Sequence, residues 1–596
     1  MSRCHAVAPI GSRPDAVDET QETSGSEGPA DDPDGEPAPR ANPLSPPVCN
    51  TSPVTDPGWY EDAVVYTLDV KTFYDSDGDG WGDFRGLIEK LDYIDDLGVD
   101  CVWLRPFFPS PLRDNGYDVA EYRAVDDRLG TLAEFEAFAD RAHDRGIRVL
   151  TDLVFNHTSV DHEWFQRARA DPDSEYHDYY LWTSHIEDAY RTVNIFPEYE
   201  DGVWSYDDVA EKWYFHQFYD HQPDLDVSNP AVRDELHDIL RFWLDRGADG
   251  FRLDAAHPML LPKGHHGTSE GIRIFEEMQD VVEAANAQAV LLAEADDEPE
   301  HLDHYFADGG AFDLLFNFVL NAHMVYAVGV RDVWPLYRAD EVLPDVSDVG
   351  QWANFLRNHD EWNLLKLPEE AFDHAREYFG PDDWSSWTFG RGHRLRLADL
   401  YDGDHDRIAM AHSLLCAYPG TPVFLSGDEV GMAADLSLEE RAAVRTPMQW
   451  NDGHNAGFSE ADPADLVTPV VDDGPASYER VNVADQASDP DSLLSRVRRL
   501  VDARRRNPVL PDGDFHIADS GHEDVFVHRL DTDDVAFIFA HNFADEYRES
   551  VLQWEVSDAD TTRAVGEGGY RVEAGGVTFL LDPCDYVWLR GDKSDW

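Results

Sequence analysis

The sequence predicts a (β/α)8 TIM barrel with an inserted subdomain after the third strand and a C-terminal antiparallel β-sandwich. Eight short apolar runs between residues 63 and 427 alternate with longer segments, several of which have the apolar spacing of amphipathic helices. Eight strand–helix units in this order are typical of a closed parallel barrel. An open, doubly wound sheet is the alternative fold for the same pattern. After about residue 507 apolar and polar residues alternate, which indicates antiparallel strands.

Order is expected to begin near Trp59, just before the first apolar run. The eight expected barrel strands span residues 63–70, 101–106, 147–153, 249–255, 288–295, 312–318, 352–358 and 421–427. Helical spacing between them is clearest in segments 132–145 and 231–245. The runs at 524–530, 534–543 and 576–581 are the expected strands of the sandwich.

The connection after the third strand is far longer than an ordinary βα loop. Residues 159–226 hold 16 aromatic residues in 68 positions. We therefore expect a subdomain that overhangs the C-terminal face of the barrel and uses most of these aromatics as its own core. The chain then divides into a tail (1–57), two barrel segments (58–158 and 227–507), the subdomain (159–226) and the sandwich (508–596).

The N-terminal tail has a composition that does not support a packed core. Residues 1–57 contain 11 of the 35 prolines and no Phe, Trp or Tyr. Such a segment buries too little apolar surface to offset the entropy lost on ordering, so we expect disorder.

The charge balance is strongly acidic, with 121 Asp and Glu against 47 Lys and Arg and a formal net charge of −74. A polyanion of this strength repels nucleic acid and anionic membranes, so neither is an expected partner. Only 6 of the basic residues are lysine, and the acid is spread along the whole chain. This composition suits a halophilic protein, because salt screens the self-repulsion.

The cysteines and the apolar runs bear on the compartment. The five cysteines (Cys4, Cys49, Cys101, Cys416 and Cys584) are scattered and form no CxxC pair. This odd set indicates a reducing compartment and no thiol-bound metal. No apolar h-region or stretch of about 18 apolar residues occurs, so a cytoplasmic protein is expected.

Polar residues stand at the ends of four expected strands, where a barrel keeps its reactive side chains. The third strand runs into Asn156 and His157, the fourth ends at Arg252 and Asp254, the fifth ends at Glu294, and the seventh runs into Asn358, His359 and Asp360. In so acidic a chain one acid at a strand end is unremarkable. Three acids on three strands, each with an Arg, a His or an apolar run beside it, indicate one shared site.

The surroundings of these acids suggest separate roles. Arg252 and Asp254 point to the same face of a strand, so the guanidinium should keep that carboxyl ionised, as a nucleophile requires. Glu294 follows four apolar residues, and burial should raise its pKa to suit proton donation. Retaining glycosidases pair two carboxyl groups roughly 5–5.5 Å apart in this way. Asp360 would stabilise a positive transition state, and His157 and His359 would donate hydrogen bonds to hydroxyl groups.

Four segments resemble the signature regions of glycoside hydrolase family 13, the α-amylase family, in order and in spacing: DLVFNH (152–157), GFRLDA (250–255), LLAEA (291–295) and FLRNHDE (355–361). QPDLD (222–226) is similar to the fifth region of the branch that holds oligo-1,6-glucosidases and trehalose synthases. Segments 110–122, 419–432 and 444–459 are most similar to the trehalose synthases of that branch. The resemblance covers roughly residues 58–596.

The resemblance implies a role for each matching residue. Asp254 would be the nucleophile, Glu294 the acid/base and Asp360 the stabiliser of the transition state. The subsite of the reacting glucose would be lined by Tyr117, Asp118, His157, Arg252 and His359, with Tyr117 as the stacking platform.

A loop after the first strand is rich in acids at every second position, from Asp75 to Asp83, with glycines between them. This pattern can direct several oxygens at one hard cation, although the twelfth position is Gly86, so it is not an EF-hand. A solvated acidic turn is the alternative. The resemblance implies a structural calcium ion held by Asp75, Asp77, Asp79, the Trp81 carbonyl and Asp83.

A second calcium site is implied by the same resemblance, with Asn156 and Asp224 as ligands. The stretch after the nucleophile that should supply a further carboxylate reads AHPMLLPKG (256–264) here, so that ligand is missing. The same stretch would form part of the wall that confines the substrate.

Three functions remain open at this point. The first is intramolecular conversion of maltose to trehalose, and the second is hydrolysis of maltose or short malto-oligosaccharides. The third is a barrel without activity that acts as a binding subunit, against which the three intact acids argue. The first two share one covalent intermediate and differ only in what attacks it, so sequence does not separate them.

Overall fold

The computed structural model describes residues 58–186, 192, 194–261, 268–346, 348–380, 384–508, 510, 513–532, 534–553, 561–573 and 575–592. The tail expected to be disordered, 1–57, lies outside these residues.

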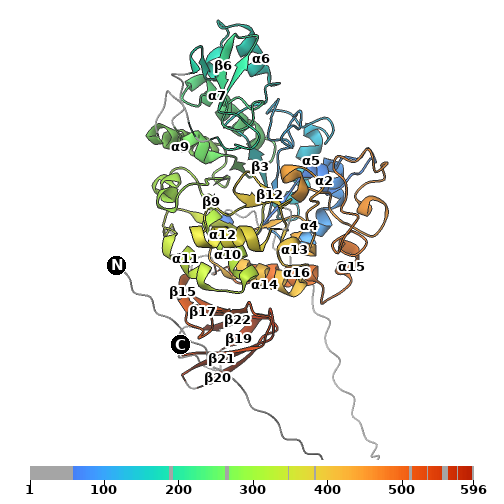
Figure 1. The fold of residues 1–596 in the computed structure, drawn as a ribbon, viewed down its shortest axis with the longest axis vertical. Coiled ribbons are helices and arrows are strands. Elements are labelled where there is room, and N and C mark those ends of the chain that lie inside the picture. Colours follow the sequence, from blue (N-terminus) through green and yellow to red (C-terminus); the bar gives the residue numbers. More distant parts are fainter. Residues whose placement is uncertain are drawn as a thin grey trace, which may run out of the picture. The chain divides into compact units, whose positions relative to one another are not determined.

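Eight parallel strands close into a barrel, and each overlaps one of the predicted apolar runs (Figure 1). Around the barrel the order is β1-β14-β10-β9-β8-β7-β3-β2, so the barrel strands follow the chain order once the strands of the smaller sheets are set aside. The bounds are β1 Val65–Leu68, β2 Cys101–Leu104, β3 Arg148–Leu153, β7 Gly250–Leu253, β8 Val290–Ala293, β9 Leu314–Phe316, β10 Gln351–Phe355 and β14 Thr421–Leu425. The predicted barrel is confirmed, and the open-sheet alternative is wrong.

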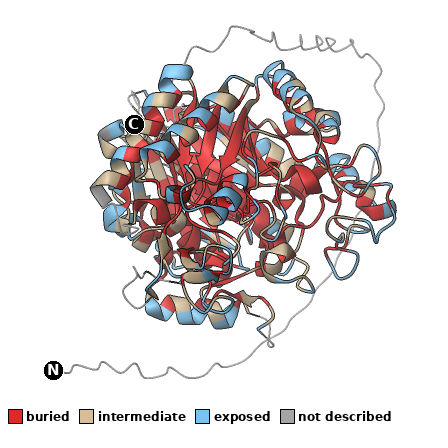
Figure 2. Ribbon diagram, turned by 90° about the horizontal axis from the view of Figure 1, so that it is seen from above, coloured by how far each residue is buried: buried red, intermediate tan, exposed pale blue. Residues whose placement is uncertain are grey.

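The barrel is a packed core, not a pore (Figure 2). Alternate residues of each strand point inward, and the inward set forms one cluster that includes Trp103, Leu292, Phe316 and Phe355. Residues between them, such as Val102, point outward to the helices. Burial on both faces explains why these strands read as continuous apolar runs.

Helices cover the outside of the barrel. They include α3 Phe84–Glu89, α4 Leu91–Leu97, α5 Leu132–His143, α7 Pro230–Leu244, α9 Thr268–Ala285, α10 Phe318–Val330, α11 Trp334–Val342, α12 Glu369–Tyr378, α14 His405–Ala417 and α16 Leu493–Arg505. Between β8 and β9 only short 3-10 turns occur, η3 Pro299–Tyr305 and η4 Ala307–Gly309. Capping fixes the helix starts: Thr131 and Glu134 form a capping box on α5.

The inserted segment after β3 has its own small sheet. It contains α6 Glu163–Ala170, η1 His177–Tyr179, and the antiparallel strands β4 Trp182–Thr183, β5 Trp204–Asp207 and β6 Lys212–Phe215 in the order β4-β6-β5. Phe165 packs against Tyr180, Trp182 and Tyr214. These aromatics pack on one another within the inserted segment.

The C-terminal segment forms two antiparallel sheets. One has the order β15-β16-β17-β22-β19 and the other β18-β21-β20. Their bounds are β15 Asp514–Ala518, β16 Val525–Asp531, β17 Val535–Asn542, β18 Arg548–Leu552, β19 Thr562–Gly566, β20 Gly569–Glu573, β21 Gly576–Leu581 and β22 Tyr586–Asp592. Ile538 and Ala540 face the space between the sheets, whereas Phe537 and Phe539 face the barrel side, so β17 is buried on both faces.

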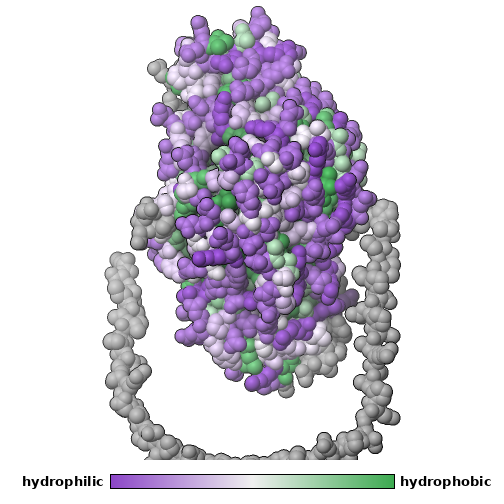
Figure 3. Space-filling view, turned by 90° about the vertical axis from the view of Figure 1, so that its right-hand side faces the viewer, coloured by the Kyte–Doolittle hydropathy of each residue, from purple (hydrophilic) through white to green (hydrophobic). Residues whose placement is uncertain are grey.

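Hydrophilic residues cover most of the face seen in Figure 3. Among the described residues, no helix combines the length and the apolar character needed to cross a membrane. Cys101, Cys416 and Cys584 are buried free thiols.

Candidate active site

The predicted acids meet in one cavity of about 310 Å³ at the C-terminal ends of the barrel strands. Asp254 follows β7, Glu294 follows β8, and Asp360 lies in the loop after β10. The cavity is also lined by residues from other loops, among them Asp114, Tyr117, His157, Phe218, Asp296, Glu361, Arg391 and Arg441. The convergence follows from parallel strands, whose carboxyl ends share one face of the barrel.

Arg252 is buried and contacts three carboxylates, although it is not itself among the residues that line the cavity. Its Nη1 donates to Oδ1 of Asp152 at 2.8 Å and to Oδ1 of Asp254 at 2.6 Å, and its Nη2 lies 2.7 Å from Oε2 of Glu294. Register explains the arrangement, because Arg252 pairs with Asp152 on β3 and with Leu292 on β8, two residues before Glu294. The two predicted reacting carboxylates therefore share one buried guanidinium.

A single guanidinium, that of Arg252, contacts three buried carboxyl groups, and the pKa of each is raised. Burial raises the pKa of Asp254 to about 7 and that of Glu294 to about 7, although Arg252 opposes both shifts. Burial also raises the pKa of Asp152 to about 6. The rise at Glu294 has the expected direction. For Asp254 the expectation was that Arg252 holds the carboxyl ionised, but burial, together with the charge of Asp152, outweighs the guanidinium and raises the pKa.

Asp360 has the opposite electrostatic surroundings. Its Oδ1 lies 3.1 Å from Arg441 Nη1 and 2.6 Å from Arg445 Nη2. Burial alone would raise its pKa, but the guanidinium groups of Arg441 and Arg445 hold the pKa well below the usual range. Of the three predicted acids, Asp360 is therefore the one that stays ionised.

Tyr117 and His359 form a stacked pair under the cavity. Their rings are parallel within 2°, with centroids 5.4 Å apart, and Tyr117 Oη lies 2.6 Å from His359 Nε2. Tyr117 also donates to Oδ2 of Asp152 at 3.0 Å. Burial lowers the pKa of His359 well below its usual value, so this histidine is neutral.

His157 and Asp118 differ in where their side chains lie. His157 lines the cavity, with Nε2 3.0 Å from the Tyr117 carbonyl and its ring against Phe218. The Asp118 carboxylate instead accepts from Ser110 Oγ at 2.7 Å and from the Arg113 amide at 3.0 Å. The Asp118 carboxylate therefore stabilises the loop to which it belongs, and Asp118 is not one of the residues that line the cavity.

Several residues of the site were not predicted. Asp152 was overlooked inside DLVFNH, although an acid within an apolar strand is itself a signal. Arg441, Arg445 and Glu361 come from loops in which a charged residue is unremarkable in sequence. Glu361 pairs with Arg391 at 2.6 Å and with Arg441 at 3.2 Å.

A cluster of two aromatic rings and two guanidinium groups lies beside the cavity, and its arginines, Arg391 and Arg441, line the cavity. Phe196 of the subdomain packs on Phe389 with centroids 4.6 Å apart. Arg441 lies over both rings, 5.1 Å from the Phe196 centroid and 5.0 Å from that of Phe389, and Arg391 lies over both at 5.9 and 5.5 Å. We call Phe196, Phe389, Arg391 and Arg441 the mouth arch. It joins the subdomain to the loops after β10 and β14.

The acidic loop after β1 brings three carboxylates together. Ligand atoms of Asp75, Asp77 and Asp83 lie within 4.8 Å of one another. Asp83 also caps α3, accepting from the Gly86 amide at 2.7 Å. Asp79 instead accepts from the Trp81 amide at 2.9 Å and is not one of the three. Carboxylate oxygens at this spacing fit a hard cation.

The residues of the implied second metal site also lie side by side. Asn156 and Asp224 are fully buried, and the Asn156 carbonyl accepts from the Leu225 amide at 2.9 Å. The described part of the following stretch, α8 Ala256–Leu260, carries no carboxylate. Pro262, Lys263 and Gly264 lie outside the described residues.

Comparison with known proteins identifies the family. Residues 67–513 match the model of the α-amylase catalytic domain. The chain belongs to the α-amylase family. The match spans every strand of the barrel after the first two residues of β1, and with them the three acids of the cavity.

Two kinds of relative stand out within the family. The chain is 41% identical over 466 residues to the trehalose synthase/amylase TreS of Mycobacterium tuberculosis, covering 77% of each chain. It is 40% identical to the trehalose synthase of Pimelobacter, covering 77% of this chain and 82% of that one. Among solved structures, the α-amylase from H. orenii superposes with a TM-score of 0.73 at 28% identity, covering 89% of this chain and 99% of that one.

Proposed function

We propose that the protein is a retaining α-glucosyl transferase that converts maltose to trehalose within one pocket. The observation that carries the proposal is the pair Asp254 and Glu294, held 2.6 and 2.7 Å from one guanidinium in a cavity that the arginines of the mouth arch line. The trehalose synthases among the relatives support the choice of substrate.

In the first step the Asp254 carboxylate attacks the anomeric carbon of the non-reducing glucose. The glycosidic bond breaks, and Glu294 gives its proton to the leaving oxygen of the second glucose. Both groups have a pKa of about 7, so near neutral pH the pair holds about one proton between them. The productive state has that proton on Glu294 and the negative charge on Asp254, next to Arg252.

In the second step Glu294, now ionised, takes the proton of the anomeric hydroxyl of the released glucose. That oxygen attacks the glucosyl carbon, displaces Asp254 and forms the 1,1-linked disaccharide. Asp360, held ionised by Arg441 and Arg445, stabilises positive charge on the sugar ring in both steps. Tyr117 supplies an aromatic face beside the reacting ring.

Isomerisation requires that the released glucose stays in the pocket. Confinement raises its effective concentration far above that of an acceptor from solution. The mouth arch supplies this confinement, together with Tyr219, which packs on Phe196 with ring centroids 4.4 Å apart. Segment 444–459 contributes Arg445, whose Nε donates to the His359 carbonyl at 2.8 Å.

Hydrolysis is the second candidate function. The lack of a carboxylate in α8 favours it. Relatives that are oligo-1,6-glucosidases, such as that of Heyndrickxia coagulans at 29% identity, also favour it. Water attacking the glucosyl-Asp254 intermediate gives glucose. The deciding experiment incubates the protein with maltose and excess isotope-labelled glucose. Trehalose with little label supports intramolecular transfer, whereas glucose as nearly the sole product leaves the hydrolase in its place.

We also propose that the 75–83 loop binds a structural calcium ion. We further propose that the protein works in a cytoplasm rich in salt. Three clustered carboxylates fit the ion, and an ion bound only to the folded state raises the melting temperature. Asp77→Ala with Asp79→Ala should abolish that rise and spare most of the turnover. A rise that persists in the double variant would place the ion elsewhere.

A further inference from the structure

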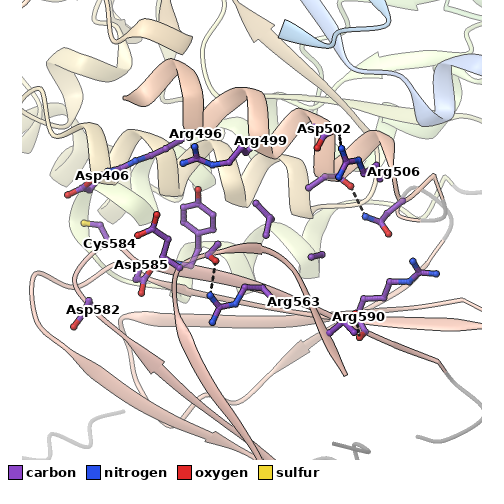
Figure 4. Close-up of a pocket in the computed structure, with 18 of the residues that line it drawn as sticks. Asp406, Arg496, Arg499, Asp502, Arg506, Arg563, Asp582, Cys584, Asp585 and Arg590 are labelled. Atoms are coloured by element: carbon purple, nitrogen blue, oxygen red, sulfur yellow. Dashed lines mark hydrogen bonds and ion pairs between the residues drawn. The ribbon is translucent and has the colours of Figure 1, made fainter. Parts of the chain in front are cut away.

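A second cavity, of about 870 Å³, lies between helix α16 of the barrel and the C-terminal sheet (Figure 4). Its walls come from one face of α16, from β19 and from the turn and strand around β22. Five arginines line it: Arg496, Arg499, Arg506, Arg563 and Arg590. In a chain with 47 basic residues and a net charge of −74, this is a marked local concentration of guanidinium groups.

The arginines face one another across the cavity. Arg499 and Arg506 are seven residues apart, which places them on the same face of α16. Arg563 and Arg590 come from the neighbouring strands β19 and β22 of the opposite wall. Figure 4 shows Arg499 and Arg506 on the helix side and Arg563 and Arg590 on the sheet side.

Within the part of the chain that the structure describes, three of these guanidinium groups have no ion-pair partner. Arg496 pairs with Asp406, and Arg506 pairs with Asp502 at 2.9 Å. Arg499 donates to the Pro490 carbonyl at 2.6 Å, and Arg563 donates to the carbonyls of Gly566 and Gly568. Within the described residues no carboxylate pairs with Arg499, Arg563 or Arg590, so most of their five N–H donors are available.

The hydroxyl of Tyr586 adds a polar group to the same cavity. The Tyr586 side chain is 9% exposed and lines the cavity. Burial raises its pKa to about 12, although Arg496 and Arg499 oppose the shift, which indicates that these two charges act on the hydroxyl. A hydroxyl near cations can donate to an anion.

Three of the acids that line the cavity lie together, whereas Asp502 lies beside Arg506. Asp406, Asp582 and Asp585 lie on one side in Figure 4, away from Arg506 and Arg590. Asp502 and Glu567 also line the cavity, so its five acids equal its five arginines in number. The cavity thus has a cationic end and an end of hydrogen-bond acceptors that suits hydroxyl groups.

We propose that this cavity binds a small phosphorylated polyol, with its phosphate between Arg499 and Arg563 and its hydroxyl groups toward the acidic end. The forked guanidinium matches phosphate oxygens in geometry, and two walls of arginine can hold one phosphate from both sides. The volume of this cavity, about 870 Å³, exceeds that of one inorganic phosphate, so a larger phosphorylated molecule fits. At 1 M salt the repulsion between a bound phosphate and acids elsewhere in the chain is screened beyond roughly 3 Å. The arginines that line the cavity then determine the electrostatic potential in it. The site is independent of the reaction proposed above.

The test measures binding of glucose 6-phosphate and of AMP to the full-length protein by calorimetry in 1 M KCl. Glucose and adenosine serve as the uncharged counterparts, and the two phosphates distinguish a sugar phosphate from a nucleotide. Arg499→Gln combined with Arg563→Gln should raise Kd at least tenfold. Arg571→Gln, an exposed arginine of β20 outside the cavity, should leave Kd unchanged.

A second variant separates geometry from charge. Arg563→Lys keeps the charge but loses the fork, so it should weaken binding several-fold while the far-UV spectrum stays that of the parent. The proposal is overturned if neither phosphate binds, if the uncharged counterparts bind as tightly, or if the Arg499→Gln, Arg563→Gln protein binds as well as the parent.

Discussion

At the scale of single residues, the sequence predicted the three acids because each follows an apolar strand, and the fold brings such positions together. It did not predict that Arg252 would be shared. That sharing depends on the register between β3 and β7, which sets Asp152 opposite Arg252. Register is a property of paired strands, and one strand's sequence does not determine it.

Asp254→Asn should abolish turnover and leave the fold intact. The amide keeps the hydrogen bond from Arg252 but cannot form the covalent intermediate, so the rate should fall by many orders of magnitude. Steady-state assays on maltose, with circular dichroism as the check on folding, measure this. Asp144→Asn, on an exposed acid after α5, is the matched control. Activity near that of the parent in verified Asp254→Asn protein would end the double-displacement mechanism.

Asp152→Asn should shift the pH dependence of kcat/KM. The productive pair needs one proton, so activity falls as pH rises through its pKa of about 7. The Asp152 charge helps to raise the pKa of Asp254, so its removal should move the alkaline limb to lower pH, by roughly one pH unit. A profile that keeps its alkaline limb while kcat falls would mean that Asp152 acts only through packing.

At the scale of elements, the eight barrel strands were predictable because each is short, apolar and buried on both faces. The two C-terminal sheets were predictable from period-two alternation. The mouth arch was not, because Phe196 and Phe389 meet across 193 residues and neither belongs to a strand or helix with a pattern. Long-range contacts between loops leave no periodic signal in sequence.

Phe389→Ala should increase the share of hydrolysis in the products from maltose. The change removes one ring of the arch and its contacts with Arg441 and Arg391, each worth about 0.5–2 kcal/mol. Water then enters and glucose leaves more readily, so the ratio of glucose to trehalose should rise several-fold. Phe372→Ala, which alters a partly buried ring packed on Trp387 away from the cavity, is the control. Equal product ratios in the two variants would show that the arch does not confine the substrate.

At the scale of the whole molecule, composition predicted the acidic surface but not where its few unpaired cations lie. Helix α4 shows the surface pattern, with Asp92, Asp95 and Asp96 exposed and Leu91 and Ile94 buried. The arginines between α16 and β19 come from segments far apart in the chain. Only the packing of the C-terminal sheet against the barrel brings them to one cavity.

The protein should unfold at low ionic strength. Its charge of −74 is screened over roughly 3 Å at 1 M salt but over roughly 30 Å at 0.01 M, so repulsion between surface acids grows on dialysis. Far-UV circular dichroism from molar to millimolar KCl should show loss of structure, and the melting temperature should fall steadily before that. Sucrose at matched osmolality is the control, because it does not screen charge. A spectrum and melting temperature that stay constant down to millimolar salt would show that the fold tolerates this charge without screening.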